Sequence, residues 1–312
     1  MSNIQVNKLH TLTGHNDSIF ALAEWAAKGI FFTGSGDGMV VQWNQANPKD
    51  GQLLARLPHS VYALEIDEKR GWLFAGHNYE GIHVIDLDTK KEIWSLKISS
   101  AAIFDLQVKD NLLMVCTGDG LVIMVDIEAR AVSRHLKIGE KSVRVLALHP
   151  NGEDFAIGMS DHTVKVFDSK DFKPKAHLVS HQNSVFALGY HPQSGDLVSG
   201  GRDAHLKIWQ AETYEEKESI AAHIFAINYL SFRKDGRYFA TCSMDKSIKL
   251  WDGESFRLLK VIDKARHAGH GTSINKVLWS KYSDHLISVS DDRTVGIWDI
   301  NISTKNEVRG TK

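Results

Sequence analysis

Cysteine is scarce in this sequence, since only Cys116 and Cys242 occur among 312 residues and they are far apart. Neither a disulfide framework nor a cysteine zinc site is therefore indicated, and a reducing compartment fits. No segment approaches the roughly 18 consecutive apolar residues of a membrane-spanning helix. The first residues, MSNIQVNKLH, lack the basic start and apolar core of a secretory signal. We expect a cytoplasmic protein without a membrane partner.

An excess of charge of either sign is also missing. Lysine and arginine number 37, aspartate and glutamate number 38, and the net charge is -1. This balance gives no general attraction to nucleic acid or acidic membranes, so nucleic-acid binding is disfavoured. Hydrophobic residues make up 43% of the chain and aromatic residues 9%, which suits a globular protein with a substantial core.

What the sequence does contain is a repeat. A histidine precedes a tryptophan by 28 positions four times, in His15–Trp43, His181–Trp209, His223–Trp251 and His270–Trp298. The stretch 223–252 reads HIFAINYLSFRKDGRYFATCSMDKSIKLWD, in which turns separate three segments rich in β-branched and aromatic residues. Such segments predict antiparallel strands.

Three further repeats end on a large apolar residue in place of the tryptophan, namely Ile85, Val125 and Phe167. The steps between successive repeat ends, from 43 to 298, are 42, 40, 42, 42, 42 and 47 residues. Seven repeats of about 40–45 residues, each with short strands, are typical of a β-propeller.

The chain resembles the WD-repeat β-propeller family over residues 4–300. The resemblance implies an all-β fold of seven four-stranded antiparallel blades, with residues 1–302 forming one propeller. It also implies that strand 4–12 completes the blade ending at Trp298 and closes the ring, which removes an open sheet edge. The polar tail, 303–312, is predicted to be disordered.

The resemblance further implies a buried network in the four repeats that contain both histidine and tryptophan. Its members are His15, Thr33, Asp37, Trp43, His181, Ser199, Asp203, Trp209, His223, Thr241, Asp245, Trp251, His270, Ser288, Asp292 and Trp298. A catalytic His-Asp-Ser set occurs once in an enzyme, whereas four copies indicate scaffolding. We therefore predict no catalytic residue, no metal site and no cofactor.

By the same resemblance, the histidine turns and aspartate hairpins share one end of the propeller, the top face. The residues predicted to bind a partner there are Phe20, Tyr62, Phe104, Arg144, Phe186, Asn228 and Asn275 on the inner strands and Arg202, Met244 and Asp291 on the hairpins. Aromatic and arginine side chains are favoured at binding hot spots. The same rings are also consistent with a plug that only caps the channel.

The favoured function is a non-enzymatic scaffold that binds a peptide or protein segment on the top face. Arg144, Arg202 and residues 263–267, which we expect to form a basic loop beside the mouth, make an acidic or phosphorylated segment one option. The alternative is a small-molecule-binding or hydrolytic enzyme that uses the channel, suggested by 16 histidines and by His77, Asn78 and Tyr79. Membership of a larger complex stays open.

Overall fold

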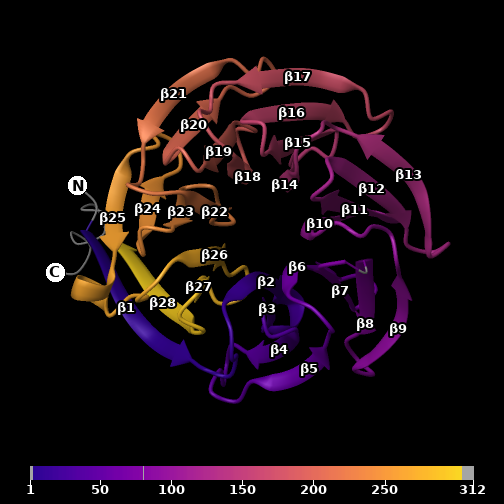
Figure 1. Cartoon of the computed structure of the whole chain (residues 1–312). Helices are drawn as coiled ribbons and strands as arrows, with labels where there is room; N and C mark the ends of the chain where they lie inside the picture. The colour runs from indigo at the N-terminus through magenta and orange to yellow at the C-terminus, as the bar shows by residue number, and fades with distance from the viewer. Residues whose placement is uncertain (1–2, 80, 304–312) are drawn as a thin grey trace.

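Seven four-stranded antiparallel sheets are arranged in a ring around a common axis (Figure 1). The structure is a computed structural model that describes residues 3–79 and 81–303. The predicted fold class, seven four-stranded antiparallel blades, is confirmed. Neither of the helices in the described ranges has the length and apolarity needed to span a membrane.

The strands follow the chain order, with the innermost strand first in blades 1 to 6. Blade 1 contains β2 (Ile19–Trp25), β3 (Ile30–Ser35), β4 (Met39–Asn44) and β5 (Gln52–Arg56). Blade 2 contains β6 (Val61–Asp67), β7 (Trp72–His77), β8 (Gly81–Asp86) and β9 (Lys91–Leu96). Blade 3 contains β10 (Ile103–Lys109), β11 (Leu112–Thr117), β12 (Leu121–Asp126) and β13 (Ala131–Lys137).

The remaining blades repeat this arrangement. Blade 4 contains β14 (Val143–Leu148), β15 (Asp154–Met159), β16 (Thr163–Asp168) and β17 (Pro174–Val179). Blade 5 contains β18 (Val185–Tyr190), β19 (Leu197–Gly201), β20 (His205–Trp209) and β21 (Glu216–Ala221). Blade 6 contains β22 (Ile227–Phe232), β23 (Tyr238–Ser243), β24 (Ile248–Asp252) and β25 (Leu258–Ile262). The short helices η1 (Ala26–Lys28) and α1 (Lys264–His267) lie in connecting segments.

Blade 7 joins the two ends of the described chain. It contains β26 (Ile274–Trp279), β27 (Leu286–Ser290), β28 (Val295–Ser303) and β1 (Asn3–Leu12). Strand β1 pairs antiparallel with β28, so the predicted closure of the ring is confirmed. Ser303 is the last residue of β28 and not part of a tail, while the rest of the predicted tail, 304–312, lies outside the described residues.

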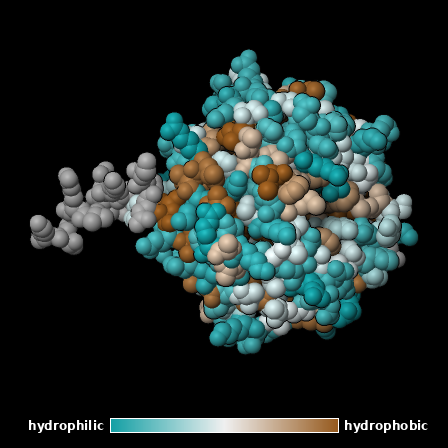
Figure 2. Space-filling model, turned by 60° about the vertical axis from the view of Figure 1, so that its left-hand side comes forward, coloured by the Kyte–Doolittle hydropathy of each residue, from teal (hydrophilic) through white to brown (hydrophobic). Residues whose placement is uncertain are grey.

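Apolar side chains fill the spaces between the blades, and the residues that replace tryptophan are buried as the indoles are. Phe167 stacks on Phe155 with ring centroids 5.4 Å apart, as Trp251 stacks on Phe239 at 6.0 Å. Packing of a large apolar group therefore persists where the histidine network is missing. Outside this core the surface is mainly hydrophilic on the side shown in Figure 2, with hydrophobic residues in separate groups.

Candidate functional site at the channel mouth

The repeated polar residues form hydrogen-bonded chains inside four blades. In blade 6 the Trp251 Nε1–H donates to Thr241 Oγ1 (2.9 Å), which lies 2.8 Å from His223 Nε2, and His223 Nδ1 lies 2.8 Å from Asp245. Because a carboxylate only accepts, Nδ1 carries the histidine proton and the threonine hydroxyl donates to Nε2. Burial lowers the pKa of His223, which favours this neutral form.

The same connections recur in blades 1, 5 and 7. Burial alone would raise the pKa of Asp203, but the hydrogen bond and charge interaction with His181, together with backbone N–H donors, hold it at about 2. These side chains connect turns to strands within a blade, and their hydrogen-bonding groups are engaged in those contacts.

A β-bulge interrupts the innermost strand of every blade at the position predicted to face a partner. The pairing register shifts across Phe20, Tyr62, Phe104, Arg144, Phe186, Asn228 and Asn275. An extra residue in one strand re-aims its side chain away from the regular ladder. The bulge thus explains why one residue per blade reaches the channel mouth.

All seven bulge residues line one cavity of about 420 Å³, together with Asp105, Val145, Tyr229 and Lys276. We call this cavity the upper chamber. Its volume lies in the range of about 300–1,000 Å³ that is usual for ligand sites. The structure thus brings together all the inner-strand residues that the sequence singled out, while their role in binding a partner stays a prediction.

Five of these residues form a continuous arc of stacked side chains. Phe20 packs against Tyr62 with ring centroids 4.8 Å apart, and Tyr62 lies 6.1 Å from Phe104. The Arg144 guanidinium then lies over Phe104 at 3.7 Å and over Phe186 at 5.0 Å. Burial lowers the pKa of Arg144, but an arginine remains protonated at any physiological pH. The arc is therefore an apolar wall with one fixed positive charge.

The two asparagines among the seven bulge residues form hydrogen bonds between neighbouring blades. Asn228 donates through Nδ2 to the carbonyl of Ile274 (2.8 Å), and Asn275 donates through Nδ2 to the carbonyl of Ile19 (3.0 Å) and to Asp291 (2.7 Å). Each amide thereby ties its blade to the next. Their N–H groups are less available to a partner than those of Arg144.

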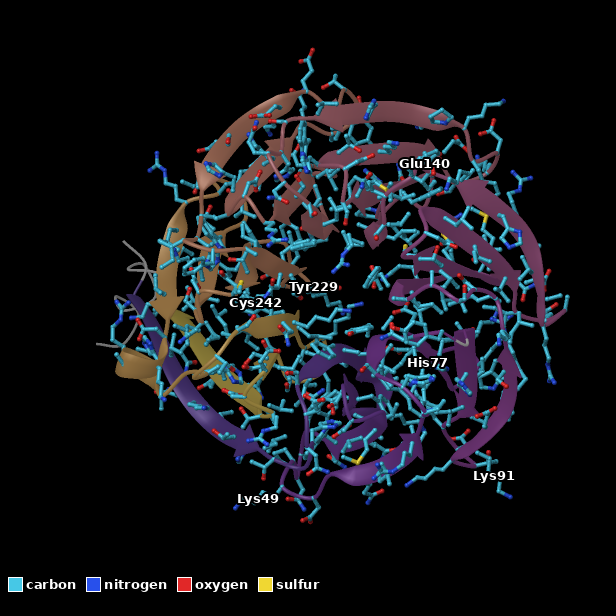
Figure 3. All side chains as sticks on the ribbon, viewed as in Figure 1. Lys49, His77, Lys91, Glu140, Tyr229 and Cys242 are labelled. Atoms are coloured by element: carbon cyan, nitrogen blue, oxygen red, sulfur yellow. The ribbon has the colours of Figure 1, made fainter. Side chains whose placement is uncertain are left out.

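A second tier of side chains lies one residue beyond the bulges, and the sequence analysis missed it. The tier reads Ala21, Ala63, Asp105, Val145, Ala187, Tyr229 and Lys276 around the ring. Four blades thus have a small or apolar residue, whereas three have a charge or a phenol. Lys276 Nζ lies 3.9 Å from Asp105 Oδ1 and 4.6 Å from the Tyr229 ring centroid, and Figure 3 shows Tyr229 beside the central opening.

Asp105, Tyr229 and Lys276 also line a second cavity of about 450 Å³, which we call the lower chamber. Glu65 lines it as well and accepts a hydrogen bond from the Val108 N–H (3.3 Å). Burial raises the pKa of Glu65 to about 8, so this carboxyl group is largely protonated at neutral pH.

The hairpin residues of the predicted set lie on the rim and not in the chamber. Arg202 and Asp291 are exposed, and Met244 is 57% exposed. Two further apolar residues are exposed in the turn beside Met244, Ile224 (78%) and Phe225 (56%). The Met244 N–H donates to the carbonyl of Ala226 (3.0 Å), and the Ser243 hydroxyl donates to the carbonyl of Phe225 (3.2 Å). The sequence held a signal for the two exposed residues of this turn, because the turns after His15, His181 and His270 have polar or glycine residues at these two positions.

The basic stretch 263–267, expected as a loop, forms helix α1 instead. Asp263 caps this helix by accepting from the Arg266 N–H, and its carboxylate also pairs with the Arg266 side chain. The local acid thus neutralises the arginine that was expected to attract an acidic partner. The stretch contributes less positive charge to the rim than the sequence suggested.

The polar residues of repeat two do not reach either chamber. His77 is buried inside blade 2, with Nε2 2.9 Å from Nε2 of His83, and Figure 3 shows it away from the central opening. Tyr79 is exposed and packs edge-on against His59. Within the described residues, no group of three or more His, Cys, Asp or Glu side chains is arranged to hold a metal ion.

Comparison with protein families gives one result. The family model described as WD domain, G-beta repeat matches residues 6–44, 132–168, 172–210, 215–252 and 263–299, which is more than half of the chain. The longest unmatched stretch, 45–131, covers the repeats that end at Ile85 and Val125, which lack the tryptophan and the histidine network. The repeat that ends at Phe167 lacks them as well and is still matched. No curated protein matches the sequence.

Proposed function

This chain belongs to the WD40 family, whose propellers commonly serve as protein-interaction scaffolds, and we propose that it binds a segment of another protein at the mouth of its central channel. The proposal covers a non-enzymatic role, in isolation or within a larger complex. A cytoplasmic location, expected from the sequence, is part of the same proposal.

The aromatic arc around Arg144 carries this proposal. Rings that line an open cavity offer much contact area at little cost in side-chain entropy. The Arg144 guanidinium makes no hydrogen bond or ion pair with any residue in 3–79 or 81–303. A cation held against two rings and left without an acceptor is well suited to an acidic or phosphorylated partner.

Exposed residues on the rim of the upper chamber also favour this face as the docking surface. Ile224, Phe225 and Met244 leave a cluster of large apolar side chains exposed next to the hairpin of blade 6. Exposed Arg202 adds a positive charge on the neighbouring hairpin of blade 5. A partner segment with both apolar and acidic residues would match this combination.

Small-molecule binding inside the channel is the second candidate. Its support is the convergence of a carboxyl group, an ammonium and a phenol at the second tier, where Asp105, Lys276 and Tyr229 line both chambers. Convergent groups of this kind are more often found in ligand sites than in a simple water-filled channel.

The test compares capture of partners by three forms of the protein. The variant Arg144→Met with Phe186→Ala is expected to lose a partner that the unaltered chain retains. The control is Tyr282→Ala, which removes an exposed aromatic ring (54% exposed) that does not line the upper chamber. A partner retained equally by all three, with each variant folded by circular dichroism, would exclude the mouth as the docking surface.

A further inference from the structure

We infer that the upper chamber receives a carboxylate group of the bound partner, held jointly by the guanidinium of Arg144 and the ammonium of Lys276. This inference rests on the proposed function, because it concerns the anchor of a segment docked at the channel mouth. It adds a residue from the second tier, Lys276, to the proposed binding site. It also specifies a carboxylate, whereas the proposed function allows either an acidic or a phosphorylated partner.

Lys276 is the first reason. The residue is only 8% exposed, yet its ammonium makes no hydrogen bond with the described residues. The nearest carboxylate oxygen, Asp105 Oδ1, is 3.9 Å away, which is beyond hydrogen-bond distance. The other oxygen of Asp105 already accepts from the Leu146 N–H at 2.9 Å. A buried ammonium requires acceptors, and Lys276, which lines the upper chamber, has only the Asp105 carboxylate at 3.9 Å and the Tyr229 ring beside it among the described residues.

The position of Lys276 is the second reason. Equivalent residues in blades 1, 2 and 5 are alanines, so Lys276 is a long charged side chain in a tier of mostly short ones, and it lines the floor of the upper chamber. Arg144 lies on the wall of the same cavity with its donors likewise unused. Two cations that make no hydrogen bond with residues 3–79 or 81–303 thus line one cavity.

The balance of charge selects a carboxylate over a phosphate group. The upper chamber is lined by two cations, Arg144 and Lys276, and by one carboxylate, Asp105. One added negative charge neutralises the set, whereas a phosphate group brings close to two and would repel Asp105. The planar fork of Arg144 also matches a carboxylate in shape.

The experiment selects short random peptides with free or amidated C-termini, displayed to the full-length protein. We expect the selected peptides to share an aspartate or glutamate, and to lose binding to Phe186→Ala. Replacing that acid by its amide, Glu→Gln, should weaken binding about ten- to a hundredfold, as should Arg144→Met or Lys276→Met. Phosphoserine in place of the acid should bind more weakly than glutamate.

The possible outcomes separate the inference from the proposed function. Peptides that depend on Phe186 but neither share an acidic residue nor require a free C-terminus, or that prefer phosphoserine, would overturn the carboxylate inference and leave the docking face intact. Selection that survives Phe186→Ala, or no selection, would overturn both. Dependence on a free C-terminus would identify the terminal carboxylate, and not a side chain, as the source. Lys276→Gln removes the charge but keeps a polar group at the same place, so it replaces Lys276→Met in the test if that variant does not fold.

Discussion

Replacing Thr241 by valine tests whether the hydrogen-bonded chain in blade 6 stabilises the propeller. Thr241 is fully buried, and its hydroxyl accepts from Trp251 and donates to His223. Valine keeps nearly the same shape but removes both connections. The indole N–H and the imidazole Nε2 would then be buried without partners, which costs about 1–3 kcal/mol each. We therefore expect Thr241→Val to lower the free energy of unfolding by about 2–5 kcal/mol.

A second variant separates the two lost bonds. In a Trp251→Phe background no indole N–H is left unsatisfied, so Thr241→Val should cost less there than in the unaltered chain. The difference should amount to about 1 kcal/mol or more. An equal cost in both backgrounds would mean that the Thr241–Trp251 hydrogen bond contributes nothing measurable.

Urea unfolding followed by circular dichroism gives the measurement, with the slopes of the transitions compared so that a change in midpoint reports stability. The matched control is Thr11→Val on the outer strand β1, where the side chain is exposed. This change should alter stability by no more than about 0.5 kcal/mol. If Thr241→Val were as mild as Thr11→Val, the view that these chains stabilise the blades would be wrong.

Three further predictions concern pH and ring closure. The pKa of Glu65 is raised from 4.5 to about 8, so between these pH values the folded state holds a proton that the unfolded state releases. The thermal unfolding midpoint should therefore fall as pH rises from 4.5 to 8, and Glu65→Gln should abolish this fall. The pKa of Asp203 is lowered from 3.8 to about 2, so its contribution to the free energy of unfolding is complete above pH 3.8 and is lost as pH falls toward 2. The Asp203→Asn variant should therefore lose less stability in that pH range than the unaltered chain. Ile4 on the closing strand β1 is only 7% exposed, so Ile4→Ala should lower the free energy of unfolding by about 2–5 kcal/mol. Leu9→Ala on the same strand, where the side chain is 40% exposed, should lower it far less, and urea unfolding measures both.

The fold was predictable because its information is repeated along the chain. Each of four repeats places histidine, aspartate, hydroxyl and tryptophan at the same spacing, so seven repeat ends were found even where Ile85, Val125 and Phe167 replace the indole. The resemblance to a known family supplied the closing strand. Helix α1 was missed because its four residues depend on one capping aspartate, Asp263, which a loop would also contain.

The candidate site was predictable only where it follows the repeat. The bulge residues share one position, directly after the valine or isoleucine that opens the innermost strand, so a count along the chain found them all. Lys276 and Asp105 lie one residue further, where the other blades have mostly alanine, and no pattern marked them. Their closeness depends on the ring bringing blades 3 and 7 to a common axis, which local sequence does not describe.

Function in a symmetric ring has to arise where the blades differ. The bulge makes every blade present one residue at the mouth, and this geometry by itself selects no ligand. Blades 1 to 5 fill the position with four rings and Arg144, whereas blades 6 and 7 use asparagines that tie the ring together. The second tier departs from small residues in blades 3, 6 and 7 alone. The aromatic wall and the charged floor thus break the symmetry independently, and a ligand that uses both must enter the channel and not simply lie across its mouth.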